Sequence, residues 1–356
     1  MRTERGPVSK QSIDRNARGK VAKAIINNTI PTILRGNARA RRGIAAVELI
    51  ANPEPGAPYY RTEAAISPTT PRKAQQLQAK PGAEKFAETS EQPGTDARPH
   101  VSGASSVATL IVSDTLEAAR QIHSKNLALP PHRRPRIAIL NMASPLRPGG
   151  GVLSGATSQE ESLCRRTTLY PSLREEFYRL PEFGAVYTPD VLVFRVDDDM
   201  IAKPSDQRDW FFVDVISAAM HRLPEVEGVG EEQRYAEEHD REAAVKKMRA
   251  VMQIVKSKDV GQVVLGAWGC GAYGNPIWEI ATAWRKVLSR GTGKGKARTA
   301  GIGLELGEAS EPSILGNMEV YFAIKDARMA EIFQRAFGSD LLKKQPAQVD
   351  IDSKDR

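Results

Sequence analysis

The stretch of this sequence with the clearest chemical potential is a run of three glycines followed by two adjacent carboxylic acids. Gly149, Gly150 and Gly151 are separated by seven residues from Gln159-Glu160-Glu161. Consecutive glycines lose more backbone freedom on ordering than other residues do, so the run predicts a loop. A ligand can approach such a bare main chain closely, and paired carboxylates can donate and accept protons. The pattern therefore indicates acid–base chemistry on a phosphorylated or sugar-bearing substrate.

The same two glutamates also fit a purely structural role. Thr157 and Ser158 each stand three residues before a glutamate. This is the spacing of a capping box, in which the acid satisfies a free backbone N–H at the start of a helix. Acids in a first turn also complement the helix dipole. From this pattern alone capping is the commoner outcome, and Asn141, at the end of a predicted strand, can equally be an ordinary turn residue.

A second glycine-rich loop follows the predicted strand 260–267. It reads Trp268-Gly269-Cys270-Gly271-Ala272-Tyr273-Gly274-Asn275, and Asn275 with Pro276 predicts an N-cap and a first helical residue. Free N–H groups and the helix dipole favour an anion at such a place. The Lys-Ser/Thr pair of a nucleoside-triphosphate P-loop is missing, and glycines also serve tight turns. Two such loops together predict a diphosphate held by backbone amides.

Strands and helices alternate along the chain from residue 107 and must position both loops. The apolar patterns predict strands at 107–112, 137–140, 191–196, 211–215, 260–267 and 320–324, and helices at 116–127, 158–180, 237–257, 276–289 and 326–337. This order indicates an α/β fold whose sheet is covered by helices on both faces. Ligands bind such sheets beyond the carboxyl ends of the strands, where both glycine-rich loops fall.

Charge and composition divide the chain into four parts. Residues 1–50 are basic and partly helical, with 11 Lys and Arg against 3 Asp and Glu, whereas the other residues hold 40 of each sign. Residues 51–105 hold eight prolines and few aliphatic side chains, so we expect them to be largely disordered. We expect residues 106–340 to form a catalytic domain and residues 341–356 a disordered tail. The basic segment can contact a polyanion, but it lacks interleaved aromatic residues, which makes a solvated helix face the simpler interpretation.

Other features exclude whole classes of protein. No run of about 18 apolar residues is present, so we expect no membrane span. Two cysteines, Cys164 and Cys270, suit a reducing compartment, nuclear or cytoplasmic, and Glu4 and Asp14 weaken a mitochondrial presequence. The Asp197–Asp199 cluster is more simply a solvated loop than a cation site, and no His-partnered motif makes Cys270 a reactive thiol. We therefore expect a monomer without metal or cofactor.

Together these segments resemble the signature of the poly(ADP-ribose) glycohydrolases, most closely the microbial-type branch of that family. The resemblance rests on Asn141-Met142-Ala143, on Pro148-Gly149-Gly150-Gly151 with the following Gln159-Glu160-Glu161, and on segments 163–170, 187–191, 215–219 and 265–273. It covers residues 107–337, with the helix at 38–50, and leaves out the Pro-rich segment and both tails. It implies a macrodomain-like fold, a mixed sheet between helices, preceded by a small helical accessory segment.

The resemblance also implies a substrate and a set of site residues. The implied substrate is a polymer of ADP-ribose, cleaved at the ribose–ribose O-glycosidic bond, and the implied partners are poly(ADP-ribose) and ADP-ribosylated proteins. Glu161 would be the catalytic acid and Glu160 a neighbour that fixes the adjacent ribose. Tyr273 would pack on the distal ribose, at a position where the family usually has Phe. The implied substrate-binding residues are Asn141, Gly149, Gly150, Gly151, Val152, Gln159, Gly269, Cys270, Gly271, Ala272 and Tyr273.

The mechanism that follows gives one residue two roles. Departure of the leaving ribose builds positive charge at the anomeric carbon and requires a proton. Glu161 would donate that proton, which requires a carboxyl that stays protonated near neutral pH, and would then activate a water molecule. Two other functions stay open: a macrodomain that binds ADP-ribose without turnover, and a hydrolase of mono-ADP-ribosylated protein. The adjacent acids favour catalysis over binding alone.

Overall fold

The computed structural model describes residues 14–53, 107–198, 204–289 and 318–345. By its internal packing the chain divides into two units, one comprising Met1–Ala57 with Ser105–Arg356 and the other Pro58–Ala104. All described residues belong to the first unit. The segment predicted to be disordered, 51–105, lies outside the described residues apart from its first three positions, and the tail lies outside them from residue 346.

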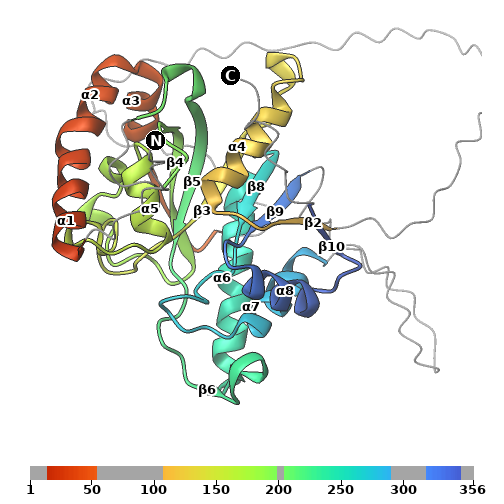
Figure 1. Cartoon of the computed structure of the whole chain (residues 1–356). Helices are drawn as coiled ribbons and strands as arrows, with labels where there is room; N and C mark the ends of the chain where they lie inside the picture. Colours follow the sequence, from red (N-terminus) through yellow and green to blue (C-terminus); the bar gives the residue numbers. More distant parts are fainter. Residues whose placement is uncertain (1–13, 54–106, 199–203, 290–317, 346–356) are drawn as a thin grey trace, which may run out of the picture. The chain divides into compact units, whose positions relative to one another are not determined.

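An eight-stranded sheet forms the centre of this unit (Figure 1). Its strands lie in the order β1-β4-β5-β3-β8-β9-β2-β10. In chain order they are β1 (Glu48–Ala51), β2 (Ala108–Ile111), β3 (Ile137–Met142), β4 (Gly184–Val193), β5 (Phe211–Ala218), β8 (Gln262–Leu265), β9 (Glu319–Ala323) and β10 (Leu342–Lys344). β4 pairs antiparallel with β1 and β5, whereas the other neighbours are parallel. The sheet is therefore mixed, as the resemblance implied. A short hairpin, β6 (Val226–Glu227) with β7 (Arg234–Tyr235), stands apart from it.

Helices cover both faces of the sheet because the strand residues alternate in direction. In β3, Ala138 and Leu140 belong to one apolar cluster, while Ile137 and Ile139 belong to another. The first cluster is completed by α6 (Glu238–Ser257), α7 (Ile277–Leu288) and α8 (Ala327–Phe337), and the second by α4 (Thr115–Asn126) and α5 (Gln159–Arg166). The predicted helices 116–127, 237–257, 276–289 and 326–337 are confirmed to within a residue at either end.

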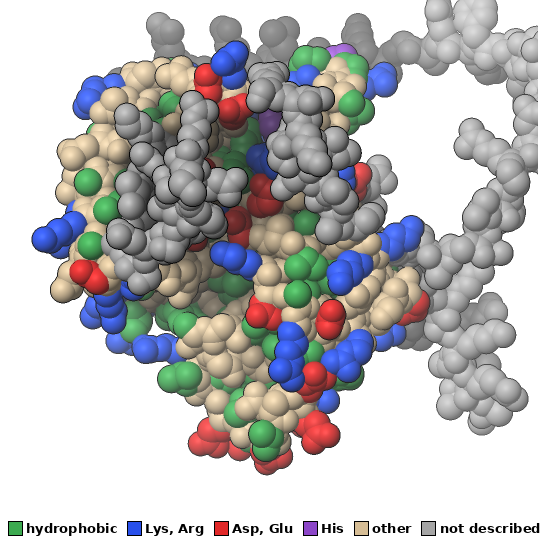
Figure 2. All heavy atoms as spheres, in the orientation of Figure 1, with side chains coloured by type: hydrophobic (Ala, Val, Ile, Leu, Met, Phe, Trp, Pro, Cys, Tyr) green, Lys and Arg blue, Asp and Glu red, His purple; other side chains and the backbone are tan. Residues whose placement is uncertain are grey.

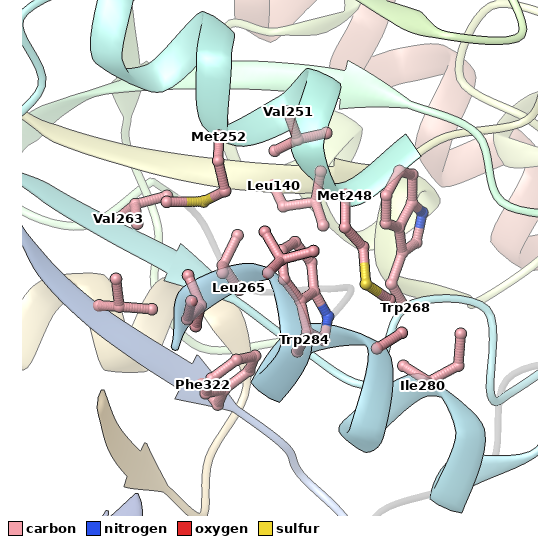
Figure 3. Packing of buried hydrophobic residues seen from close by; sticks show 14 of the residues in the cluster. Leu140, Met248, Val251, Met252, Val263, Leu265, Trp268, Ile280, Trp284 and Phe322 are labelled. Atoms are coloured by element: carbon pink, nitrogen blue, oxygen red, sulfur yellow. The ribbon is translucent and has the colours of Figure 1, made fainter. Parts of the chain in front are cut away.

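Figure 3 shows the packing on the first face. Trp284 of α7 and Met248 of α6 lie against the sheet residues Leu140, Leu265 and Phe322. Trp284 and Phe322 are fully buried. Burying side chains of this size stabilises the fold by about 2 kcal/mol each or more, so this face anchors the strands that carry the site. No helix among the described residues is long and apolar enough to cross a membrane.

The N-terminal segment packs against the sheet and ends as one of its strands. It contains α1 (Arg15–Ala24), a π-helical turn at Ile25–Thr29, α2 (Ile30–Gly36) and α3 (Ala38–Ala45). The predicted helix at 38–50 is thus too long. Residues 48–51 instead form the edge strand β1, because Glu48 to Ala51 pair with Tyr187 to Gly184 of β4. Of its basic residues, Arg39 forms an ion pair with Asp190 at 2.7 Å and lies over the Phe212 ring.

Three other sequence predictions were wrong at their boundaries. The helix predicted at 158–180 ends at Arg166, because Thr167 is extended and bridges to Val193 of β4. β4 itself begins at Gly184, seven residues before the apolar run that predicted it. The tail predicted from residue 341 supplies β10, which pairs parallel with β2 and buries Leu342 completely.

Candidate active site

The two glycine-rich loops meet at one edge of the sheet. β3 and β8 are parallel neighbours, so their carboxyl ends lie side by side. The first loop, residues 143–158, leads from β3 to α5, and the second loop, residues 266–276, leads from β8 to α7. A cavity of about 810 Å³, here called the main cavity, opens between them. The arrangement predicted from the order of strands and loops is therefore confirmed.

Most of the predicted site residues line the main cavity. Those that do are Gly150, Gly151, Gln159, Glu160, Glu161, Gly269, Gly271, Ala272 and Tyr273. Four others lie behind this lining. Asn141, Gly149 and Val152 are buried, and Cys270 is half-buried against the apolar core. The substrate-binding roles of all thirteen residues, with Glu160 and Glu161 among them, stay predictions.

The two glutamates do not cap their own helix. Ser158 is the N-cap residue of α5, but its side chain makes no capping hydrogen bond. Glu160 Oε2 instead accepts a hydrogen bond from Ser144 N–H at 2.7 Å, and Glu161 Oε1 accepts one from Gly151 N–H at 2.8 Å. Capping, which the pattern alone favoured, is therefore wrong for both acids. Their carboxyl groups turn toward the first loop because its free N–H groups lie within reach.

Glycine is required at positions 149 and 150. Both residues have left-handed backbones, with φ of 65° at Gly149 and 58° at Gly150. A Cβ at Gly150 would stand 2.7 Å from Glu161 Oε1 and 2.9 Å from Glu160 Oε2, and a Cβ at Gly149 would meet the Tyr170 ring at 2.8 Å. The absence of a side chain at these two positions therefore makes room for the Glu160 and Glu161 carboxyl groups and for the Tyr170 ring.

Two polar side chains fix the carboxyl end of β3 to its neighbours α5 and β5. Gln159 Oε1 accepts from Met142 N–H at 2.8 Å, and Gln159 Nε2 donates to the Leu140 carbonyl at 2.7 Å. Asn141 is fully buried, and its Nδ2 donates to Ser217 Oγ at 3.0 Å. Asn141 Oδ1 has no hydrogen-bond partner within the described part of the chain. Gln159 thus fixes α5 to the strand end, while Asn141 keeps one acceptor available.

The second loop is held by Asn275, although in a different way from that predicted. Pro276, not Asn275, occupies the N-cap position of α7, and α7 begins at Ile277. The Asn275 side chain accepts from Tyr235 O–H at 2.7 Å and donates to the carbonyls of His221 and Gly269 at 2.8 and 3.1 Å. It therefore serves the loop and not the helix, because its side chain is buried among these partners.

Burial changes the protonation of the carboxyl pair. Glu160 and Glu161 are only 3% and 6% exposed. Burial, with a smaller contribution from the charge of Glu161, raises the pKa of Glu160 to about 8, although the Ser144 N–H opposes the shift. The pair can therefore hold a proton at neutral pH, as general acid catalysis requires. Burial likewise raises the pKa of Tyr273, whose hydroxyl is hydrogen-bonded to the Ser144 side chain, the kind of partner that a buried hydroxyl needs.

The raised pKa of Glu160 predicts a dependence of stability on pH. Because its pKa rises from 4.5 when exposed to about 8 in the fold, the folded protein binds the proton more tightly than the unfolded chain. Stability is therefore full below pH 4.5 and falls as the pH rises toward 8. The Glu160→Gln side chain is neutral at every pH. Between pH 4.5 and about 8 the melting temperature of wild type should therefore fall relative to that of Glu160→Gln, and above this range the difference between the two should stay constant.

Thermal unfolding followed at several pH values tests this expectation. Glu176→Gln is the matched control, because the Glu176 side chain is 66% exposed. A difference between Glu160→Gln and wild type that does not change with pH would contradict the assignment of the buried proton to Glu160.

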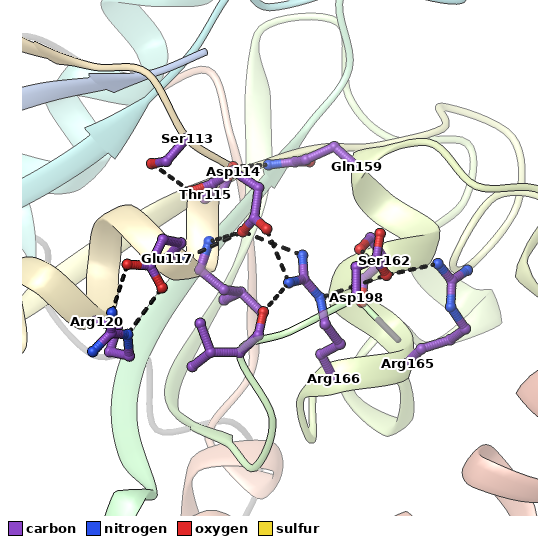
Figure 4. A network of polar contacts seen from close by, with 12 residues as sticks. Ser113, Asp114, Thr115, Glu117, Arg120, Gln159, Ser162, Arg165, Arg166 and Asp198 are labelled. Carbon is purple, nitrogen blue, oxygen red and sulfur yellow. Dashed lines mark hydrogen bonds and ion pairs between the residues drawn. The ribbon is translucent and has the colours of Figure 1, made fainter. Parts of the chain in front are cut away.

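The acidic cluster at 197–199 is partly used within the protein. Asp198 pairs with Arg165 at 3.3 Å and accepts from Ser162 Oγ at 3.0 Å (Figure 4). Asp199 lies outside the described residues. Among the residues that are described, no group of three or more His, Cys, Asp or Glu side chains is placed to hold a metal ion.

A second cavity, of about 310 Å³, adjoins the main cavity. This side cavity shares Met142, Ser158, Gln159 and Gly271 with it, and adds an apolar wall of Ala323, Ile324 and Met329. Asp114 and Arg166 form its other side and pair at 3.2 Å, as Figure 4 shows. Asp114 is also the N-cap residue of α4. The sequence did carry a signal for this side of the cavity, which is the polar run 113–115 directly after β2 of the same sheet.

The comparisons with known proteins agree with this geometry. Residues 59–196 match the family model described as "Microbial-type PARG, catalytic domain", where PARG stands for poly(ADP-ribose) glycohydrolase. The matched segment spans less than half of the chain. The match is to the family to which the sequence pattern pointed.

The solved structures of one PARG, that of Thermomonospora curvata, share this fold. The PARG of Thermomonospora curvata is 20% identical, covers 91% of this chain and 100% of its own, and has a TM-score of 0.55. Its complex with the inhibitor ADP-HPD gives 20% identity, coverage of 89% and 100%, and a TM-score of 0.53. The PARG of Deinococcus radiodurans bound to ADP-ribose is 26% identical, covers 67% of this chain and 86% of its own, and has a TM-score of 0.47. A comparison with curated proteins finds no match.

The PARG match covers the first loop and both glutamates but not the whole site. It begins within the Pro-rich segment, which we expected to lie outside the family resemblance, and ends at residue 196 instead of 337. The second loop and α6 to α8 therefore lie beyond the matched residues. The second loop is assigned to the site by geometry alone, because it lines the main cavity together with the glutamates.

Proposed function

We propose that this protein is a poly(ADP-ribose) glycohydrolase that cleaves ribose–ribose O-glycosidic bonds and releases ADP-ribose. The observation that carries the proposal is the buried carboxyl pair on the wall of the main cavity. Glu160 and Glu161 are each fixed by a backbone N–H of the first loop. A protein that only binds ADP-ribose has no need for two adjacent buried acids, since burying them costs free energy.

Glu161 is the general acid and base in this proposal. Its Oε1 is held by Gly151 N–H, and its Oε2 has no hydrogen-bond partner among the described residues. Oε2 donates a proton to the leaving ribose oxygen as the bond to the anomeric carbon breaks and oxocarbenium character develops. The resulting carboxylate accepts a proton from the water that attacks this carbon, which restores Glu161 for the next turnover.

The two cavities suit the two ends of an ADP-ribose unit. The apolar wall formed by Ala323, Ile324 and Met329 in the side cavity offers a surface to a purine ring. The diphosphate then lies where the cavities join, beside Gly271 and the first loop, and backbone N–H groups bind it. This places the terminal ribose in the main cavity beside Glu160, which fixes the sugar, and Glu161, which acts on the bond.

Substrate choice is tested by comparing two ADP-ribosylated materials. The protein is incubated with poly(ADP-ribose) and, separately, with mono-ADP-ribosylated protein, and free ADP-ribose is measured by chromatography. We expect rapid release from the polymer. Binding to the polymer without release would identify a reader module, and release from the mono-ADP-ribosylated protein alone would identify a hydrolase of single units. Either result would overturn the proposal.

A further inference from the structure

Two exposed leucine–arginine pairs stand at the mouth of the main cavity. Leu146 and Arg147 belong to the first loop, and Arg222 and Leu223 follow β5. Leu146, Arg147 and Arg222 line the cavity directly. Leu146 is 47% exposed and Leu223 is 68% exposed, and neither lies in a helix or strand. Each side of the mouth thus presents one apolar side chain next to one guanidinium group.

Backbone hydrogen bonds connect both pairs to the site. The N–H groups of Leu146 and Arg147 donate to Ser144 Oγ at 3.3 Å, and Ser144 N–H in turn holds Glu160. On the opposite side, Leu223 N–H donates to the Tyr273 carbonyl at 2.9 Å. Leu223 has a φ of 52°, a conformation that a bulky residue adopts only when its surroundings impose it. Both pairs are therefore positioned with the catalytic residues.

The arginines at the mouth are available to an anion. Among the residues that the structure describes, the side chains of Arg147 and Arg222 form no ion pair or hydrogen bond with the protein. A third cation comes from the N-terminal segment, since Arg15 also lines the cavity. On the face of the molecule that Figure 2 shows, basic side chains are scattered among acidic ones.

Helix α1 is fixed firmly enough to place Arg15 there. Arg15 Nε donates to the Ser154 carbonyl at 3.1 Å, and Arg18 Nε donates to the Gly155 carbonyl at 2.9 Å. The two backbones touch closely, because a Cβ at Gly155 would stand 2.0 Å from the Arg15 carbonyl oxygen. The basic N-terminal segment is therefore part of the cavity wall, which its sequence did not reveal.

We propose that Arg15, Arg147 and Arg222, with Leu146 and Leu223, form a rim that binds the ADP-ribose unit on the far side of the scissile bond. That unit brings a diphosphate, which guanidinium groups bind through charge-assisted hydrogen bonds. It also brings a purine ring, which stacks on apolar and guanidinium surfaces. The inference rests on the proposed function. With this rim a two-unit oligomer binds more tightly than ADP-ribose alone.

Binding of one unit and of two units tests the rim. The parent protein is the full chain carrying Glu161→Gln, so that the oligomer is not consumed, and the probes are ADP-ribose and its two-unit oligomer. Calorimetry should show the oligomer binding about tenfold more tightly than ADP-ribose. Arg147→Glu with Arg222→Glu should abolish this advantage and leave the Kd of ADP-ribose within about twofold. Both side chains are exposed and form no ion pair or hydrogen bond within the described residues, so the melting temperature should not change.

A matched charge control separates the rim from general electrostatics. Arg133→Glu with Lys256→Glu makes the same change in net charge, on exposed residues that precede β3 and β8 at the opposite edge of the sheet. Equal affinity of the parent for one and two units would overturn the inference. So would a rim variant that loses both ligands equally, or a control that loses as much as the rim variant. If wild type released no ADP-ribose from the polymer, that result would contradict the proposed function and not the rim alone.

Discussion

Replacing Glu161 with glutamine should stop the release of ADP-ribose from the polymer while ADP-ribose still binds. Glutamine keeps an oxygen that can accept the hydrogen bond from Gly151 N–H, so the side chain and the first loop should stay in place. It cannot donate a carboxylic proton or take one from water. Since general acid–base catalysis contributes about 10²- to 10⁴-fold, and Glu161 acts in both steps, we expect kcat to fall on the order of 10³-fold or more.

The measurement combines turnover with binding. Release of ADP-ribose from poly(ADP-ribose) gives kcat, and calorimetry with ADP-ribose gives the Kd, which should stay within about threefold of wild type. Glu331→Gln, an exposed glutamate on α8, makes the same chemical change away from the cavities and should keep wild-type turnover. Substantial activity of Glu161→Gln would remove Glu161 from the mechanism. In that case Glu160, whose raised pKa lets it hold the proton, is the next acid to test.

The sequence could predict where the glutamates lie but not where their carboxyl groups point. The spacing of Thr157 and Ser158 before them fits a capping box as well as a catalytic pair, and the choice depends on Ser144 and Gly151, more than nine residues away along the chain. Such contacts form only once β3 and α5 have packed together. A local pattern does not contain them, so the family resemblance had to supply the orientation.

Elements with strong local signals were predicted well, and elements made by pairing were not. The period of apolar residues in α6 and the Asp114 cap of α4 act within a few residues, and both helices are confirmed. β1 and β10 depend on partners more than 100 residues away, at β4 and β2. Their short sequences carry too little periodicity to distinguish a strand from a helix end or a tail.

The N-terminal segment illustrates the same limit for function. Its surplus of positive charge is visible in the sequence, and it indicated contact with a polyanion or a solvated surface. The structure shows that Arg15 and Arg18 donate hydrogen bonds to carbonyl groups of the first loop and that Arg39 forms an ion pair with Asp190. These contacts each span more than 130 residues of sequence. The composition of the segment therefore predicted a polyanion as partner, whereas the fold determines which of its basic side chains are free to contact one.

Gly150→Ala should damage catalysis far more than it damages the fold. The added methyl group would stand 2.7 Å from Glu161 Oε1 and 2.9 Å from Glu160 Oε2, and the backbone φ of 58° adds strain for alanine. The backbone term costs about 1 kcal/mol. The clash is with the ends of two side chains, which can rotate away, so the protein should still fold. In doing so they must leave the N–H groups of Ser144 and Gly151 that hold them.

Losing that geometry is the larger effect. Misplacing a catalytic group by about 1 Å can cost about 10²-fold in rate, and here both acids must move, so we expect kcat to fall at least about 10²-fold. The melting temperature, the Kd for ADP-ribose and turnover of polymer are measured together. Gly36→Ala is the control, because nothing lies within 4 Å of its Cβ position and it ends α2 far from the glutamates in sequence. Near wild-type turnover by Gly150→Ala would show that the bare main chain at this position serves the loop's turn and not the placement of the two carboxyl groups.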